Sequence, residues 1–302
     1  MNQGAKKTLV TTSAIDYLPL VSIGIPTFNR PEGLRRTLEC ITAQTYRHLE
    51  IIVSDNASPG SATELVAREF MALDSRVRFF RQTENRGHFF NFQFVLKKAT
   101  GEYFMWAADD DLRDSKFVSA LLIKIVGQPD VAIAFCNFHE LDESGHYHSA
   151  YPEHLTLLRP FTTTNSWLRL WRYFIQDERL GKANLIYGLM RRQDLIGFNW
   201  EKFVQKYGTF GIDMLFVYKL LGSGRLALES SLLYGCTVGN VKHYDESGGA
   251  HQKKWLKQLG KFNQWFCYYT RYISVTGGGY KLLPIIGLPL KIGRLLLMNV
   301  AK

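Results

Sequence analysis

The stretch that decides the fold is YFMWAADDD, residues 103–111. Six apolar or aromatic residues, as in a buried strand, run directly into the carboxylates of Asp109, Asp110 and Asp111. Three neighbouring negative charges repel one another, so they are tolerated best where water or a cation offsets them. Hard cations such as Mg²⁺ bind a few carboxylates together with phosphate oxygens. The stretch predicts a strand that ends at a metal and diphosphate site, and it leaves open the alternative of a polar turn that caps the next helix.

Strand-like and helix-like segments alternate around residues 103–111. Pro31 is typical of a first helical residue, and Leu34, Leu38 and Ile41 follow on one face of that helix. Strands are predicted at residues 21–25, 50–54, 77–81, 103–107 and 131–136, and further helices at residues 62–70, at 91–98 and after Ser115. Repeated strand–helix units predict an α/β fold with a mostly parallel central sheet and helices on its faces.

Polar clusters follow three of these strands. They are TFNR at residues 27–30, DNAS at residues 55–58 and the acidic run at residues 109–111. In open parallel sheets, ligands bind beyond the carboxyl ends of the strands. We therefore expect the three clusters to converge on one crevice.

The second half of the chain is less regular. Strands are predicted at residues 185–190 and 231–238 and a helix at 214–221, while GSG at residues 222–224 is a turn without a phosphate-loop context. From Lys253 onward an aromatic and aliphatic stripe follows helical spacing, with lysines elsewhere on the surface; the stripe consists of Trp255, Leu259, Phe262, Phe266 and Ile273. The stripe fits either packing onto the domain or a basic amphipathic helix at a membrane.

Size and composition describe a folded protein. The 302 residues, 46% hydrophobic and 14% aromatic, can bury the core of one large domain or of two smaller ones. The four cysteines, Cys40, Cys136, Cys236 and Cys267, are far apart and form no Cys-x-x-Cys pair. This spacing argues against a disulfide framework or a zinc site, and it fits a reducing, cytoplasmic compartment.

The charge balance favours anionic partners. The formal net charge is +10 and the pI is about 9.4. No RNA- or DNA-binding motif accompanies this charge, so we expect no nucleic-acid partner. Residues 1–18 lack the apolar core of a signal peptide. The apolar stretch at residues 282–300 is interrupted by prolines and basic residues, which disfavours a membrane-spanning helix and favours a helix lying on an anionic membrane surface.

The motifs, in order and at their spacing, resemble glycosyltransferase family 2, a family of inverting enzymes with the GT-A fold. The resemblance runs roughly from Leu20 to Tyr244, and the acidic run matches the Asp-x-Asp region of the family. The other matching segments are VSIGIPTFNR at 21–30, LEIIVSDNAS at 49–58, NRG at 85–87 and TGEY at 100–103. The resemblance implies an N-terminal tail at residues 1–18, a GT-A catalytic domain at 19–244 and a helical C-terminal region at 245–302.

The resemblance also implies roles for individual residues. Residues expected to bind the nucleotide sugar are Pro26, Thr27, Asn29, Arg30, Asp55, Asn56, Asn85, Gly87, Asp109 and Asp110. Mn²⁺ or Mg²⁺ is expected at Asp109 and Asp111, with His243 as a further ligand. Asp55 would accept a hydrogen bond from a uracil or thymine N–H, or it forms an ordinary Asx turn. Arg30 would contact phosphate, or it is a plain surface charge.

The sequence departs from the family pattern at one position. The family often places a further acid two residues before its paired aspartates, and Ala108 stands there. Asp109 and Asp111 still form an Asp-x-Asp pair, so the division of roles among the three acids is left open.

Inversion requires a base that takes the proton of the acceptor hydroxyl, on the face of the sugar opposite the diphosphate. Asp213 matches the segment in which the family carries this base, and an N-cap aspartate is the alternative. Asp177, Glu178 and Asp194 are weaker rivals.

These residues lead us to expect an inverting transferase. It would move a sugar from a UDP- or dTDP-type donor to a hydroxyl of a glycan or lipid-linked glycan, in bacterial O-antigen or capsule synthesis. A nucleotidyltransferase of sugar activation is a rival, although PTFN at residues 26–29 lacks a glycine-rich phosphate loop. A non-catalytic glycan- or lipid-binding protein of the same fold is the third hypothesis. The sequence specifies neither the sugar nor the oligomeric state.

Overall fold

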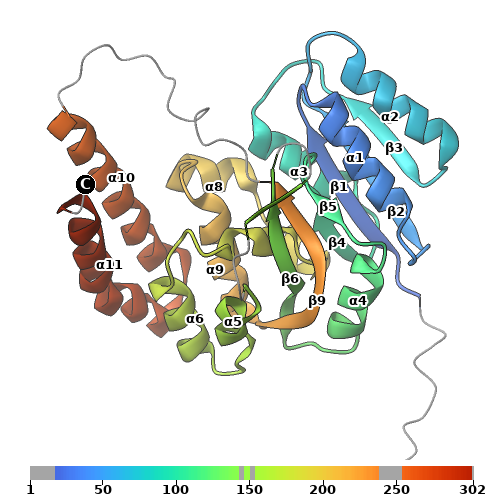
Figure 1. Ribbon diagram of the computed structural model, residues 1–302. Coiled ribbons are helices and arrows are strands. Elements are labelled where there is room, and N and C mark those ends of the chain that lie inside the picture. Colours follow the sequence, from blue (N-terminus) through green and yellow to red (C-terminus); the bar gives the residue numbers. More distant parts are fainter. Residues whose placement is uncertain (1–17, 143–145, 150–153, 238–253, 301–302) are drawn as a thin grey trace, which may run out of the picture.

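The computed structural model describes residues 18–142, 146–149, 154–237 and 254–300. Its central sheet has the strand order β3-β2-β1-β4-β8 (Figure 1). β1 pairs in parallel with β2 and β4, β2 pairs in parallel with β3, and β8 is antiparallel to β4. The bounds are β1 Val21–Thr27, β2 Leu49–Asp55, β3 Val77–Arg81, β4 Tyr103–Trp106 and β8 Met190–Arg191. Since four neighbouring strands are parallel, their carboxyl ends share one edge of the sheet.

Helices cover this sheet because each has one apolar face. α1 buries Leu34, Leu38 and Ile41, the face expected from their spacing. α1 and α2 lie side by side, while α3 packs on β1 and β2 (Figure 1). The helices of this half are α1 Pro31–Thr42, α2 Ala62–Leu73, α3 His88–Lys98 and α4 Phe117–Ile125. The predicted α/β fold with a mostly parallel sheet and flanking helices is confirmed.

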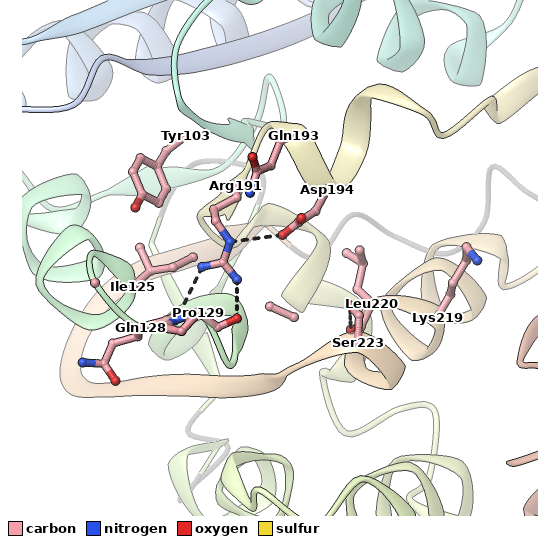
Figure 2. Close-up of a pocket in the computed structure, with 12 residues that line it drawn as sticks. Tyr103, Ile125, Gln128, Pro129, Arg191, Gln193, Asp194, Lys219, Leu220 and Ser223 are labelled. Atoms are coloured by element: carbon pink, nitrogen blue, oxygen red, sulfur yellow. Dashed lines mark hydrogen bonds and ion pairs between the residues drawn. The ribbon is translucent and has the colours of Figure 1, made fainter.

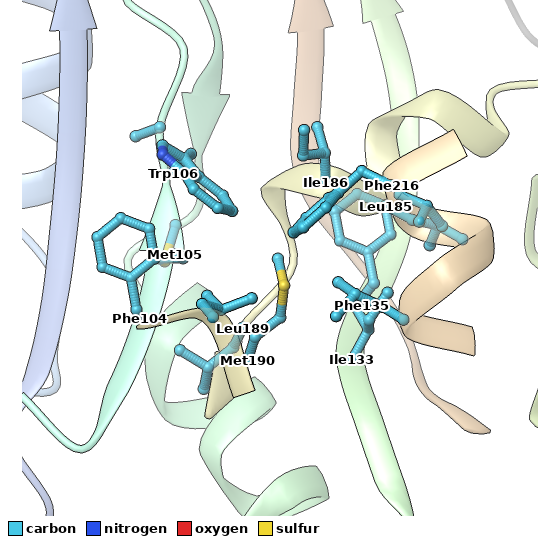
Figure 3. Close-up of a cluster of buried hydrophobic side chains, with 14 of the residues drawn as sticks. Phe104, Met105, Trp106, Ile133, Phe135, Leu185, Ile186, Leu189, Met190 and Phe216 are labelled. Atoms are coloured by element: carbon cyan, nitrogen blue, oxygen red, sulfur yellow. The ribbon is translucent and has the colours of Figure 1, made fainter. Parts of the chain in front are cut away.

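A second sheet continues the first. Its order is β5-β9-β6-β7, and a bridge between Ala134 and Leu189 connects it to the segment that leads into β8. Figure 3 shows the apolar side chains that fill the junction, with Phe104 and Trp106 from β4 facing Phe135 from β6 and Phe216 from α9. The bounds are β5 Leu112–Arg113, β6 Val131–Leu141, β7 Tyr147–Ser149, β9 Arg225–Thr237 and α9 Ile212–Ser223.

The sequence interpretation was wrong at residues 185–190. The structure forms a 3₁₀-helix at Lys182–Tyr187, and only Met190 of the predicted segment belongs to a strand. Short apolar runs are buried in either conformation, so periodicity alone does not separate them. The strand predicted at 231–238 is the second half of β9, whose turn-forming residues at 229–231 hid its continuity.

Of the remaining helices, α10 and α11 form one side of the molecule, and α6 lies beside α11 (Figure 1). The remaining helices are α5 His154–Leu158, α6 Ser166–Ile175, α7 Gln193–Ile196, α8 Trp200–Tyr207, α10 Lys254–Val275 and α11 Leu282–Val300, with 3₁₀ turns at Arg159–Thr162 and Gly278–Lys281. α10 packs through Tyr268 and Tyr272, which are fully buried, whereas Phe266 of the predicted stripe is exposed. Phe262 of the stripe is half-buried and packs against the core, so the buried side of α10 coincides with the stripe only in part. Within the described residues, no helix has the length and apolarity to cross a membrane.

Candidate active site

The carboxyl ends of β1 and β4 meet through side chains. Thr27, the last residue of β1, donates a hydrogen bond from Oγ1 to Asp109 Oδ2 at 2.7 Å. The Arg30 guanidinium lies 3.4 Å from Asp109 Oδ1 and also bonds Asp110. Gly33 packs against the Asp109 carbonyl so closely that a Cβ would overlap it. The first turn of α1 thus supports the acidic residues 109–111, which we call the acidic turn.

The loops after β1 and β2 are held in an unusual backbone conformation. Outside glycine, positive φ occurs within the described residues at Asn29 (55°) and Ala57 (61°). The Asn29 amide donates to Ser58 Oγ at 2.7 Å, which joins the two loops. Strained backbone of this kind costs energy, and it concentrates at binding and catalytic sites. Both loops were predicted to bind the nucleotide.

Asp55 forms the local turn that the sequence left as one alternative, and its role toward a base stays a prediction. Its Oδ1 accepts hydrogen bonds from the Ser58 amide at 3.0 Å and the Ser58 hydroxyl at 2.5 Å, as in a local turn. Its Oδ2 is buried without a hydrogen bond from any described residue, and Arg81 Nε lies 3.7 Å away. Oδ2 is thus a buried acceptor with capacity for a donor such as a base N–H.

Hydrogen bonds connect Asn56, Asn85 and Gly87. Asn56 Nδ2 donates to Asn85 Oδ1 at 2.8 Å, and the Gly87 amide donates to the same oxygen at 2.9 Å. Gly87 precedes α3 with a φ of 84°, a conformation that glycine adopts without steric cost. Pro26, in contrast, is buried inside β1. The His88 ring packs against that of Phe89, with ring centroids 3.8 Å apart and the planes tilted by 46°.

The acidic turn is shaped by the second sheet as well. Asp111 accepts a hydrogen bond at Oδ2 from Tyr234 and at Oδ1 from the Thr237 amide at 2.9 Å. Thr237 Oγ1 donates to the Asp110 carbonyl at 2.5 Å. Sequence reasoning missed both β9 residues, because nothing in their spacing relates them to residues 109–111.

Burial and charge crowding raise the proton affinity of the acidic turn. Burial first, and the neighbouring Asp110 second, raise the pKa values of Asp109 and Asp111 to about 6. A divalent cation would relieve this repulsion, and the carboxylate oxygens fit a hard cation. Asp110 is the most exposed of the three side chains, whereas both oxygens of Asp111 are engaged by β9. The geometry therefore favours Asp110, with Asp109, for a cation, and the metal role of Asp111 stays a prediction.

Asp213 lies in the first turn of α9 and not at its N-cap, which is Gly211. Burial raises the pKa of Asp213, and Oδ1 accepts from the Met214 amide at 2.9 Å. The ring of Tyr187 lies 6.3 Å from that of Tyr234, which bonds the acidic turn. Burial, and then the charges of Asp111, Asp110 and Asp213, hold the pKa of the Tyr187 phenol well above 10. Tyr187 is thus a further site residue that the sequence did not reveal.

The rival bases are engaged elsewhere. Asp177 pairs with Arg179 at 2.8 Å, and Glu178 pairs with Lys182 at 3.0 Å. Asp194 pairs with Arg191 beside a cavity of 620 Å³ (Figure 2). This cavity is lined by Tyr103, the first residue of β4, so it opens at the edge of the sheet opposite the acidic turn. His243, the remaining predicted ligand, lies outside the described residues.

Comparison with known proteins agrees with this geometry. The profile of Glycosyl transferase family 2 matches residues 22–189, more than half of the chain, including both loops and the acidic turn. The chain belongs to glycosyl transferase family 2. The Campylobacter jejuni GalNAc(5)-diNAcBac-PP-undecaprenol beta-1,3-glucosyltransferase is 34% identical over 108 residues, 35% of each chain.

Two solved glycosyltransferase structures share the fold of this chain. The mannosyltransferase PcManGT from Pyrobaculum calidifontis, in complex with GDP-Man and Mn²⁺, has a TM-score of 0.55 at 16% identity, covering 95% of this chain and 75% of its own. Staphylococcus aureus TarS 1-349, in complex with UDP-GlcNAc, has a TM-score of 0.54 at 13% identity, covering 87% of this chain and 83% of its own. The chain matches only 15% and 40% of the length of two uncharacterized Rickettsia glycosyltransferases.

Proposed function

We propose that this chain transfers a sugar from a nucleoside diphosphate sugar to a hydroxyl group, with inversion at the anomeric carbon. The observation that carries the proposal is the contact of Thr27 and Arg30 with Asp109. It brings the loop after β1, which the family match includes, against the acidic turn. A donor lying across this edge would meet the Asp55 acceptor with its base and the acidic turn with its diphosphate.

The carboxylates of Asp110 and Asp109 would hold Mn²⁺ or Mg²⁺ together with the donor phosphates. When bound, the cation neutralises charge on the departing diphosphate. Arg30 already pairs with both carboxylates, so it is placed to move from them to a phosphate when the donor binds. This exchange would release the acidic turn for the cation.

Asp213 is proposed as the base. As the acceptor oxygen bonds to the anomeric carbon, the bond from that carbon to the phosphate oxygen breaks, and the acceptor proton passes to the Asp213 carboxylate. Asp213 is half-buried, and this partial burial raises its pKa, which suits a general base. The Tyr187 ring lies 6.3 Å from that of Tyr234, whose hydroxyl bonds Asp111, so it would position the sugar beside the acidic turn.

The donor is proposed to be of UDP or dTDP type, because Asp55 offers an acceptor to the ring N–H of uracil or thymine. The TarS complex contains UDP-GlcNAc, which supports this class, whereas the PcManGT complex contains GDP-Man. Guanine also carries a ring N–H, so donors of both classes belong in the test.

The acceptor is proposed to be a glycan hydroxyl, carried on a lipid in a bacterial O-antigen or capsule pathway. The name of the Campylobacter relative supports this, since its acceptor contains PP-undecaprenol. A lipid-borne acceptor would place the enzyme at the cytoplasmic face of the membrane.

Donor hydrolysis with Mn²⁺ or Mg²⁺ tests the reaction class. We expect release of a nucleoside diphosphate from one donor of a UDP-, dTDP- and GDP-sugar panel. Asp110→Asn should abolish this release, whereas Asp130→Asn, which removes an exposed carboxylate remote from the turn, should not. Pyrophosphate formation would instead identify a nucleotidyltransferase. Neither product with any donor, together with no thermal stabilisation by any of them, would identify a non-catalytic protein.

A further inference from the structure

The outer helix α11 is built with its apolar side outward. Its inward positions include Leu283, Gly287, Lys291 and Leu295, all buried. Its outward positions carry large apolar side chains that are 49–63% exposed; they are Leu282, Ile285, Ile286, Leu290 and Leu296. A surface helix of a soluble protein normally turns its charged residues outward. In α11 the pattern is reversed, so the helix exposes a strip of apolar side chains to water, which is energetically unfavourable.

A buried ion pair fixes α11 in this orientation. Lys291 is 2% exposed, and its Nζ lies 2.8 Å from Glu178 Oε1 and 2.7 Å from the Gln176 carbonyl. Rotation of the helix would withdraw this ammonium from its partners. Lys291 is therefore unable to contact lipid, although the sequence suggested a basic surface there. The ion pair also keeps the leucines and isoleucines of α11 on its outward side.

α6 extends the strip. Trp167 is 46% exposed and Leu168 is 38% exposed. The Trp167 ring lies 5.3 Å from that of Tyr280, in the 3₁₀ turn that precedes α11, and α6 and α11 lie side by side (Figure 1). We call these two residues, with the five outward residues of α11, the apolar face. An exposed cluster of this kind marks an interaction site.

The positive charge of the C-terminal region indicates that the partner of the apolar face is anionic. Residues 247–302 contain nine Lys or Arg and no Asp or Glu, out of 37 basic and 27 acidic residues in the whole chain. Nearly all of the +10 net charge thus comes from this region. Lys281, just before the outward strip, and Arg294, near its other end, are exposed. Arg159, Arg172 and Arg294 line an adjoining cavity of 740 Å³, together with a single acidic residue, Asp177.

We propose that the apolar face docks on an anionic lipid bilayer, with α11 lying in the interface plane and the exposed Lys281 and Arg294 at the headgroup phosphates. Apolar side chains on one face with cations beside them are the requirements of such a helix. A second copy of the chain fits the face less well, because it would bring two regions of the same positive charge together. The docking does not depend on the transfer chemistry.

Vesicle co-sedimentation tests the proposal on the full-length protein. We expect binding to vesicles of 70% phosphatidylcholine and 30% phosphatidylglycerol, and about tenfold weaker binding to pure phosphatidylcholine. Ile285→Ser/Ile286→Ser/Leu290→Ser should weaken binding to the anionic vesicles at least about tenfold. Leu73→Ser/Ile123→Ser, which changes apolar residues on α2 and α4 that are 77% and 78% exposed, is the control and should bind as the wild type. Equal binding by both variants would overturn the proposal.

A second measurement locates the contact. Vesicles with brominated acyl chains should quench the tryptophan fluorescence of the wild type, and Trp167→Phe should remove most of that quenching. Quenching that persists in Trp167→Phe would show that another surface is inserted. Light scattering without lipid reports the competing outcome: a wild-type dimer that becomes monomeric in the triple serine variant would assign the face to a second copy. Neither assay requires sugar transfer, so either can fail while the proposed activity stands.

Discussion

The phenol of Tyr234 on β9 donates a hydrogen bond to the Asp111 carboxylate, although 123 positions separate the two residues. The bond ties the second sheet to the acidic turn, which otherwise belongs to the first sheet. Arg113 lies behind it, with its guanidinium carbon 5.1 Å from the centre of the Tyr234 ring. The shape of the acidic turn thus depends on the second half of the chain.

Tyr234→Phe should therefore loosen the acidic turn. It removes a donor from a buried carboxylate, which should lower the free energy of unfolding by about 1–3 kcal/mol. It should also raise the Mn²⁺ concentration needed for half-maximal donor hydrolysis. Denaturant titration and a metal titration of activity measure the two effects. Tyr187→Phe is the comparison, since Tyr187 is half-buried and should affect turnover more than stability.

Asp213→Asn should separate chemistry from binding. The amide keeps the shape of the side chain but accepts no proton, so turnover should fall by about 10²–10⁴-fold. Donor affinity, measured by calorimetry, should stay within about twofold of the wild type. Wild-type transfer rates in this variant would remove Asp213 from the role of base.

Lys291→Met should be far more destabilising than Lys281→Met. Lys291 is buried against Glu178, and removal of one partner of a buried pair typically costs about 3 kcal/mol. Lys281 is exposed, so its removal should change the free energy of unfolding by less than about 0.5 kcal/mol. Urea unfolding of the two variants checks this difference. Equal midpoints would show that α11 is not held by the pair.

His154 should make the fold sensitive to acid. It stacks on Phe138 with ring centroids 3.7 Å apart, and burial lowers its pKa to about 4. Between the usual pKa near 6.5 and pH 4, the unfolded chain binds a proton that the folded chain does not, so stability falls as the pH is lowered through this window. His154→Phe should lose less stability between pH 7 and pH 4.5 than the wild type. Identical losses in urea titrations at the two pH values would contradict this cause.

The sequence was sufficient for the first half of the fold. Strands 21–25 and 50–54, with a proline-started helix between them, have strict apolar patterns and clear turn residues, and they form β1, α1 and β2. The convergence of the site loops could be predicted as well, since parallel strands place their carboxyl ends at one edge of the sheet. The structure adds that Thr27 and Arg30 touch the acidic turn directly.

The second half could not be predicted to the same degree, for physical reasons. The roles of Tyr234 and Tyr187 depend on tertiary contacts between distant segments. The orientation of α11 was hidden because Lys291 looks like a surface residue until Glu178 is placed against it. A helical pattern is usually interpreted with leucines facing the core and lysines facing solvent, and in α11 the structure places them the other way round.

The most direct test of the central claim is the anomalous diffraction of Mn²⁺ in crystals grown with a uridine or thymidine diphosphate. We predict a manganese peak beside the Asp110 carboxylate, with the base at Asp55 and the diphosphate between the two. A peak elsewhere, with the nucleotide away from the carboxyl ends of β1 and β2, would contradict the assignment of this edge as the donor site.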